Sequence, residues 1–396
     1  MKRVLKAAAA ILLMMVFAVG CNKPDEPNNG GDNVGQNDSI VDPNNGGNNG
    51  GGNGGGNNQY YQVSVSASVG GSVTGGGSYL EGNTCTVSAI PEANYAFADW
   101  TENGSSVSSL QNYSFAVTGD RSLEANFIES NAPTGAINGL FTINANGDQV
   151  YFSQGNLRYQ ASTNIWKFAE QQYYYLGNSN SNISQTNGGW IDLFGWGTSG
   201  YNHGAVCYQP WSTSEEERDY YAYGSDEYSL YDVTGYADWG YNAIGNGGNT
   251  EGQWRTLTRL EWSYIFNTRS TTSGMRYTRA QVNNVDGLIL LPDNWSNNYY
   301  NLIYSGNYSG NVISSSIWVN SLEAHGAVFL PAAGYRIGST LYGLGNYYMD
   351  GYGHYWSASC YGGSCAYSMV FGSNFGPIDY DRRCYGLSVR LVCPAE

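Results

Sequence analysis

Apolar and polar residues alternate in short runs along residues 60–127, and pairs of glycine or asparagine-glycine separate the runs. The alternation is clear at residues 61–65 and again at 122–127. A period of two places successive side chains on opposite faces of a strand, and Gly-Gly or Asn-Gly pairs favour tight turns. The pattern therefore predicts a small antiparallel β module over residues 59–129.

The order of motifs in this module resembles a bacterial surface repeat found in listerial and Bacteroidetes proteins. The resemblance rests on Tyr-Ala-Phe-Ala-Asp-Trp at 95–100 and on the closing Leu-x-Ala-Asn-Phe at 123–127. The chain holds one copy, so it is not a solenoid. The resemblance implies a stalk or spacer.

The N-terminus has the features of a lipoprotein signal peptide over residues 1–20. Basic residues precede an apolar stretch at 7–19, which is too short and wrongly flanked for a membrane span. Residues 18–21 resemble a bacterial lipobox, which implies that Cys21 carries a lipid and that the membrane is contacted through this anchor alone. The charged segment at 23–26 resembles the signal that directs Bacteroidetes-type lipoproteins to the cell surface. We expect an outer-membrane protein that faces outward.

Residues 21–58 are dominated by glycine, asparagine and aspartate. Such a segment holds too little apolar surface to offset its conformational entropy, so it predicts a disordered tether behind the lipidated cysteine. Within it, residues 38–40 match the Asp-Ser/Thr-aliphatic pattern of Bacteroidetes O-glycosylation. Ser39 is therefore a candidate glycosylation site.

Charged residues make up 12% of the chain, the formal net charge is -15, and there are 35 tyrosines. Nucleic-acid binding requires lysine and arginine to neutralise phosphates, so this composition argues against it. Tyrosine surrounded by Asn, Ser and Gly is typical of surfaces that bind through large, semi-rigid contacts, as antibody loops do. The same composition is also that of an extracellular β-rich protein without such a surface.

Residues 135–396 read as one continuous domain. The best helix candidate spans 254–266, where Thr258 can cap the helix and Glu261 stands three residues on. The Trp-Arg-x-Leu-Thr-x-x-Glu-Trp motif at 254–262 resembles the corresponding helix in the formylglycine-generating-enzyme branch of C-type-lectin folds. Further motifs continue the resemblance in order, at 287–295, 327–336, 355–357 and 388–391.

The fold class expected from this resemblance is α+β, with a small all-β repeat module followed by a C-type-lectin-like domain. An acidic run at 215–219 is either a solvated loop or the rim of a binding face.

Two sets of residues alternate near the C-terminus. The first, which we call the framework residues, is mainly aromatic, apolar or arginine, and comprises residues 355–359, 366, 367, 369, 371, 383 and 386–392. The residues between them can be encoded by triplets ending in C or T, the set reached by randomising the adenines of asparagine codons. No Lys, Glu, Gln or Trp lies between positions 360 and 385.

This contrast resembles the variable proteins of diversity-generating retroelements, whose C-type-lectin-like domain ends in a variable region closed by a Ser-Val-Arg-Leu strand. The resemblance implies a diversified ligand-binding surface at about 355–392, with tyrosines as anchors and small polar residues as adaptable partners. Ser368, Val370 and Gly372 alternate with apolar neighbours, so we expect them on an exposed face. The predicted contact residues are Tyr361, Gly362, Ser364, Cys365, Ser368, Val370, Gly372, Asp379, Tyr380, Asp381, Cys384 and Tyr385.

Cys360 and Cys365 have the spacing of the copper ligands of formylglycine-generating enzymes, and thiolates are suitable Cu(I) ligands. The basic run that follows the second cysteine in those enzymes is missing, and Cys384 lies in the same triplet set. We therefore expect no enzyme, no catalytic residue, no metal and no cofactor, and leave open a disulfide between Cys360 and Cys365. Hydrolase elbows, phosphate loops and His-Glu-x-x-His motifs are absent from the sequence.

The expected partner is a protein or glycan on another cell, a host or a phage. The alternatives are an invariant adhesin or fimbrial tip subunit and, with less support, a copper-dependent formylglycine-generating-type oxidase.

Overall fold

A computed structural model describes most of the chain after residue 58. The segments predicted as a signal peptide and a tether, with Cys21 and Ser39, lie outside the described residues. The described ranges are 59–92, 95–108, 110–202, 206–221, 230–231, 236–343, 351–372 and 376–395.

The predicted β module is present and is built from two sheets, with strand orders β3-β1-β8-β5-β6 and β2-β4-β7. Pairing is antiparallel except between β1 and β8, which run parallel. Burial alternates as the sequence predicts: in β4, Cys85, Val87 and Ala89 are buried between exposed or half-buried neighbours. The strands are β1 (Tyr60–Ala67), β2 (Gly71–Thr74), β3 (Gly77–Leu80), β4 (Thr84–Pro91), β5 (Tyr95–Glu102), β6 (Ser105–Ser108), β7 (Asn112–Ala116) and β8 (Arg121–Glu129).

In the rest of the described chain, strands again outnumber helices. Over all described residues, strands make up 41% and helices 12%, and the two α-helices are α1 (Arg259–Asn267) and α2 (Ser315–Ile317). This composition favours an all-β fold, so the predicted α+β class is wrong. The prediction gave too much weight to the helix expected at 254–266, whose first residues instead form strand β14 (Arg255–Thr256).

Five further sheets follow the β module, with orders β14-β25-β10-β9, β12-β11-β13, β17-β15-β16-β18, β20-β19-β24 and β21-β22-β23. Their remaining strands are β9 (Phe141–Thr142), β10 (Gln149–Phe152), β11 (Leu157–Gln160), β12 (Ile165–Phe168), β13 (Trp190–Ile191), β15 (Tyr277–Val282), β16 (Val285–Leu290), β17 (Val312–Ile313), β18 (Val328–Pro331), β19 (Tyr335–Ile337), β20 (Thr340–Tyr342), β21 (Gly353–Tyr361), β22 (Cys365–Phe371), β23 (Gly376–Arg382), β24 (Tyr385–Gly386) and β25 (Leu391–Pro394).

Short helical turns connect these strands. They are η1 (Gly177–Asn182), η2 (Val206–Tyr208), η3 (Glu217–Asp219), η4 (Trp239–Tyr241), η5 (Tyr308–Gly310), η6 (Trp318–Leu322) and η7 (Glu323–His325), of which η6 is a π turn and the others are 3-10 turns.

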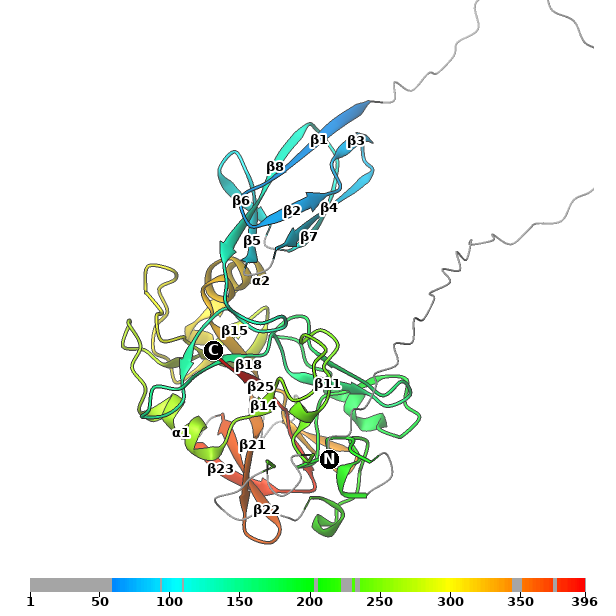
Figure 1. The fold of residues 1–396 in the computed structure, drawn as a ribbon, viewed down its shortest axis with the longest axis vertical. Coiled ribbons are helices and arrows are strands. Elements are labelled where there is room, and N and C mark those ends of the chain that lie inside the picture. The colour runs from blue at the N-terminus through cyan, green and yellow to red at the C-terminus, as the bar shows by residue number, and fades with distance from the viewer. Residues whose placement is uncertain are drawn as a thin grey trace, which may run out of the picture. The chain divides into compact units, whose positions relative to one another are not determined.

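The sheet β21-β22-β23 is covered on both sides by apolar side chains. Trp356, Ala358 and Ala366 belong to one hydrophobic core, whereas Met369 and Phe371 belong to a second. Figure 1 shows these strands in orange to red with helix α1 beside them. This double coverage determines which side chains of the sheet reach solvent.

Helix α1 begins with the capping box that the sequence predicts. The Glu261 amide donates to the Thr258 hydroxyl at 3.2 Å, and the Thr258 amide donates to the Glu261 carboxylate at 2.7 Å. Trp262, Ile265 and Phe266 form the buried face, whereas Leu260 is 65% exposed. The helix therefore gains its stability from its first turn and from one apolar face.

We expect Thr258→Ala to lower the free energy of unfolding by about 1 kcal/mol, because it removes the capping hydroxyl. The control is Leu260→Ala, which should change it by less than about 0.5 kcal/mol because this side chain is exposed. Urea denaturation followed by tryptophan fluorescence measures both. Equal losses in the two variants would contradict the capping role.

Candidate functional site

The last three-stranded sheet presents one hairpin to solvent. Residues 362–364 form the turn between β21 and β22, and all three are exposed. Tyr361 precedes this turn and is 39% exposed, and Tyr380 on β23 is 51% exposed. We call residues 361–364, 379, 380 and 382 the hairpin surface, because all of them are exposed.

Tyrosine rings from all three strands meet at the hairpin surface. Tyr361 stacks on Tyr380 with 4.3 Å between ring centroids, and Tyr367 meets Tyr361 edge-on at 5.0 Å. Tyr367 and Tyr380 are also directly opposite in the β22–β23 register. The Arg259 guanidinium of helix α1 lies 4.9 Å from the centre of the Tyr367 ring. Rings that pack on one another in this way lose little conformational freedom when a partner binds.

The prediction that Ser368, Val370 and Gly372 face solvent is wrong. Ser368 is 0% and Val370 7% exposed, and Gly372 is buried against the ring of Tyr352. The period-two argument assumes a strand with one solvent face, but β22 is the central strand between two cores. A register shift between Ser368 and Val370 further breaks the alternation.

Four other predicted contact residues also lie partly or wholly below the surface. Cys384 is 1% exposed, and Cys365, Asp381 and Tyr385 are half-buried. The Tyr385 ring stacks on Tyr335 at 5.8 Å. These residues support the hairpin surface and contribute little area to it.

Asp381 connects all three strands through its carboxylate. One oxygen accepts a hydrogen bond from the Ser368 hydroxyl at 2.7 Å and lies 3.3 Å from Nδ1 of His354. His354 belongs to β21, Ser368 to β22 and Asp381 to β23. The carboxylate therefore fastens the strands to one another. The sequence analysis predicted that Ser368 contacts a ligand, but in the structure its hydroxyl binds Asp381.

Arg383 holds the hairpin turn through main-chain atoms. Its guanidinium donates to the carbonyl oxygens of Gly362 at 2.7 Å, Cys365 at 3.2 Å and Tyr221 at 3.0 Å. It also lies over the Trp196 ring at 5.3 Å, and burial lowers its pKa. Carbonyl oxygens are present whatever side chain a residue carries. The turn is thus anchored by contacts that do not depend on the side chains at 362 and 365.

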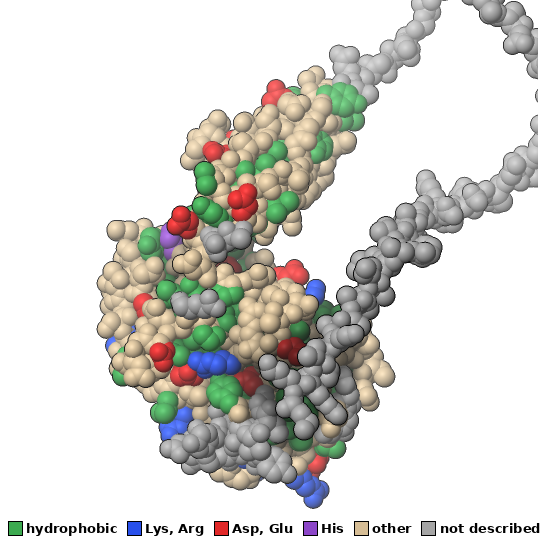
Figure 2. Space-filling view, in the orientation of Figure 1, with side chains coloured by type: hydrophobic (Ala, Val, Ile, Leu, Met, Phe, Trp, Pro, Cys, Tyr) green, Lys and Arg blue, Asp and Glu red, His purple; other side chains and the backbone are tan. Residues whose placement is uncertain are grey.

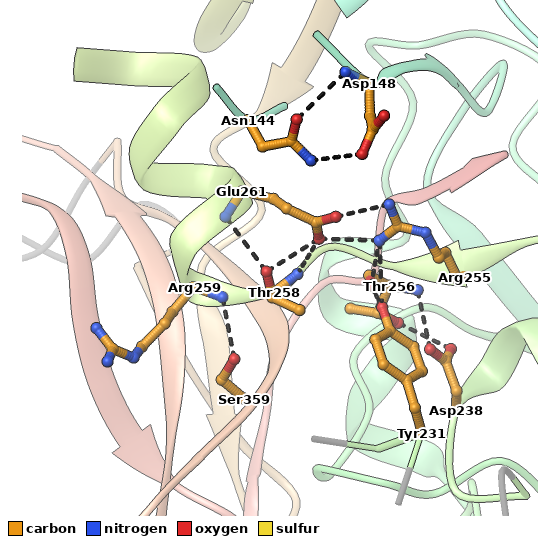
Figure 3. A network of polar contacts seen from close by, with 10 residues as sticks. All are labelled: Asn144, Asp148, Tyr231, Asp238, Arg255, Thr256, Thr258, Arg259, Glu261 and Ser359. Carbon is orange, nitrogen blue, oxygen red and sulfur yellow. Dashed lines mark hydrogen bonds and ion pairs between the residues drawn. The ribbon is translucent and has the colours of Figure 1, made fainter. Parts of the chain in front are cut away.

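Helix α1 supports the same sheet from its N-terminus (Figure 3). The amide of Arg259 donates to the Ser359 hydroxyl on β21 at 3.1 Å. Glu261 completes the capping box and also binds Arg255 at 2.7 Å. The network fixes the start of the helix, from which the Arg259 side chain reaches the Tyr367 ring.

The acidic run at 215–219 borders the hairpin surface. Glu217 forms an ion pair with Arg382 at 3.3 Å. On the face of the molecule drawn in Figure 2, acidic and basic side chains are scattered among uncharged atoms, and some of them lie close together. Arg382 and Gly363 are exposed positions that the predicted contact set omitted, although both belong to the triplet-encoded residues.

The cysteines do not form disulfides among the residues that the structure describes. Cys360 is 3% exposed, and burial raises the pKa of the Cys365 thiol and raises that of Cys384 to about 11. Low-pKa, accessible thiols are the ones that react or bind metals readily, whereas Cys384 is buried and has a raised pKa. The described part of the chain also shows no group of three or more His, Cys, Asp or Glu residues arranged to hold a metal ion.

Residues 61–131 match the family model for a divergent InlB B-repeat domain. The resemblance of the β module to a bacterial surface repeat is therefore confirmed. Searches of curated proteins and of solved structures find no match. A surface repeat domain is compatible with a surface-displayed, adhesin-like protein, and it suggests an extracellular or surface location. In the described ranges, no helix is both long and apolar enough to cross a membrane.

We expect Arg383→Ala to lower the free energy of unfolding by about 3 kcal/mol, because three carbonyl oxygens lose a charged donor and the buried side chain leaves a cavity. The matched control is the neighbouring Arg382→Ala, whose exposed ion pair should contribute less than about 1 kcal/mol. Urea denaturation compares the two variants. Similar losses in both would contradict the anchoring role of Arg383.

We expect the Cys384 thiol to resist alkylation in the native protein at neutral pH. Its raised pKa leaves little thiolate, and its burial blocks the reagent. Iodoacetamide labelling at pH 7.5, followed by peptide mass spectrometry, should modify the half-buried Cys365 before Cys384. Unfolding in urea is the control and should make both thiols react alike. Faster native labelling of Cys384 would refute this assignment.

Proposed function

We propose that this protein is a surface-displayed ligand-binding protein whose hairpin surface is diversified. The observation that carries the proposal is an exposed, mutually stacked pair of tyrosines, Tyr361 and Tyr380, on a turn that Arg383 anchors through main-chain oxygens. Binding is non-covalent recognition of a protein or glycan partner, with these rings as anchors.

The distribution of triplet-encoded residues supports this proposal. Every position of the hairpin surface belongs to that set, whereas Tyr355, Trp356, Arg383 and Arg390 of the framework are buried. Five other triplet-encoded residues, Cys360, Ser368, Val370, Gly372 and Cys384, are also buried, so the proposal applies only to the exposed members of the set. Exposed substitutions usually change stability little, and buried ones change it much. A chain arranged in this way can vary its contact surface while keeping its fold.

The resemblance of residues 355–392 to the variable regions of diversity-generating retroelements points in the same direction. The lipobox resemblance at 18–21 and the tether at 21–58 support display from the outer membrane through a lipid on Cys21, with Ser39 as a glycosylation site. The divergent InlB B-repeat at 61–131 fits the role of a spacer.

An invariant adhesin is the second candidate function, and the surface repeat domain is the observation that favours it. It requires the same display but a fixed hairpin surface. The two candidates differ in what natural sequence variation they predict.

Deep sequencing of the 3′ end of the gene in a population of the source bacterium tests the proposal. We expect substitutions at the codons of the hairpin surface and none at the codons of Arg383 or Trp356. The substituted bases should correspond to adenines in a second, nearly identical copy of this DNA segment nearby in the genome. Position 362 should be confined to Gly, Asn and Asp, because its φ of +60° is left-handed. If these codons are invariant and no such second copy exists, the diversified surface is rejected and the invariant adhesin is the remaining candidate function.

A further inference from the structure

We propose a second binding site, for a neutral sugar ring, in a hollow between the β11–β12 turn and residues 185–186. The hollow has a volume of about 510 Å³, within the range typical of small-ligand sites. None of its residues belongs to the hairpin surface, so this site goes beyond the proposed function. It is lined by Tyr159, Ala161, Ser162, Asn164, Gln185, Thr186 and Trp211.

Two aromatic rings line the hollow, and they belong to a longer stack. Trp211 is half-exposed and lies nearly parallel to Tyr159, with 6.2 Å between ring centroids and 24° between planes. Tyr159 packs on Trp166 at 4.4 Å, and Trp166 packs on Phe194 at 5.6 Å inside the core. Three of these four rings are buried, so the exposed ring is held in place before any ligand arrives.

The walls carry amide and hydroxyl groups. Asn164, Gln185, Ser162 and Thr186 are all exposed. The Tyr159 hydroxyl donates to the Asn164 side-chain oxygen at 3.0 Å, which fixes that amide and leaves its NH₂ group as a donor toward a ligand. The Ser162 amide donates to the Asn187 carbonyl at 3.1 Å, which ties the turn to the segment that carries residues 185 and 186.

None of the seven lining residues is charged, although the chain carries a formal net charge of -15. A charged ligand entering this hollow would give up hydration without meeting an opposite charge. A sugar has C–H groups that can pack against the face of an aromatic ring and hydroxyls that both donate and accept hydrogen bonds. Amides and hydroxyls offer both functions in return, so a neutral sugar fits this lining better than an ion or a purely apolar molecule.

The test is saturation-transfer NMR on the full chain with the methyl glycosides of glucose, galactose, mannose and N-acetylglucosamine, each at millimolar concentration. We expect transfer to at least one glycoside, with the millimolar dissociation constant usual for a single small ring. The double variant Asn164→Gly and Gln185→Ala should weaken binding by at least about tenfold, since it removes both amides. Glycine at 164 tolerates the positive φ of that position, so the turn is kept.

Trp211→Ala should abolish saturation transfer. Trp211→Phe keeps an aromatic ring on Tyr159, so it should retain part of the transfer. This second variant shows whether the loss in Trp211→Ala is due to a folding defect. The control is Leu260→Ala at an exposed position of α1 outside both proposed sites, which should leave transfer unchanged. No transfer to any of the four glycosides, or transfer that the amide double variant leaves intact, would overturn the proposal. Transfer lost in Tyr361→Ala would place the sugar on the hairpin surface and would overturn it equally.

Discussion

The hydrogen bonds from Arg383 to main-chain carbonyl oxygens are the interaction on which the C-terminal hairpin depends. A buried guanidinium must have its donors satisfied, and here carbonyls of the turn and of Tyr221 satisfy them. Arg336 is held in the same manner by the carbonyls of Leu193, Ser212 and Gly338. Such contacts specify the path of the backbone without specifying its side chains.

This arrangement separates the side chains that stabilise the sheet from the exposed side chains that are proposed to bind a partner. Trp356 belongs to one hydrophobic core and Phe371 to the other, so apolar residues cover both faces of the last sheet around these two positions. At the exposed end of this sheet, next to the turn at 362–364, the rings of Tyr361 and Tyr380 stack on each other. A surface that meets a partner through tyrosine can change its small polar neighbours and keep an anchor. That division is what the proposed diversified function requires.

The parts of the fold that follow from local rules could be predicted from the sequence. The alternation at 60–127 gave the β module, and Thr258 with Glu261 gave the start of α1, because strand pleating and capping act within a few residues. The fold class could not be predicted in this way. One capped helix and a resemblance suggested α+β, but the amount of helix depends on how the long connections pack.

The sequence indicated only some of the exposed residues of the candidate site, because burial on both faces of a strand is not visible in a local pattern. Four of the predicted contact residues, Tyr361, Ser364, Asp379 and Tyr380, are exposed. Ser368 and Val370 are not, because a period of two cannot distinguish a strand with one covered face from a strand covered on both. The anchoring role of Arg383 could not be predicted from the sequence, because its partners include the carbonyls of Gly362 and Tyr221, which lie far from it along the chain.

Saturation mutagenesis of residues 355–392, scored for folding by resistance of the displayed protein to protease, tests the central claim most directly. The account predicts that positions 361, 363, 364, 379, 380 and 382 accept most residues, whereas Trp356, Ser368 and Arg383 accept almost none. Intolerance at the hairpin surface equal to that of the framework would contradict it, because the turn would then depend on its own side chains.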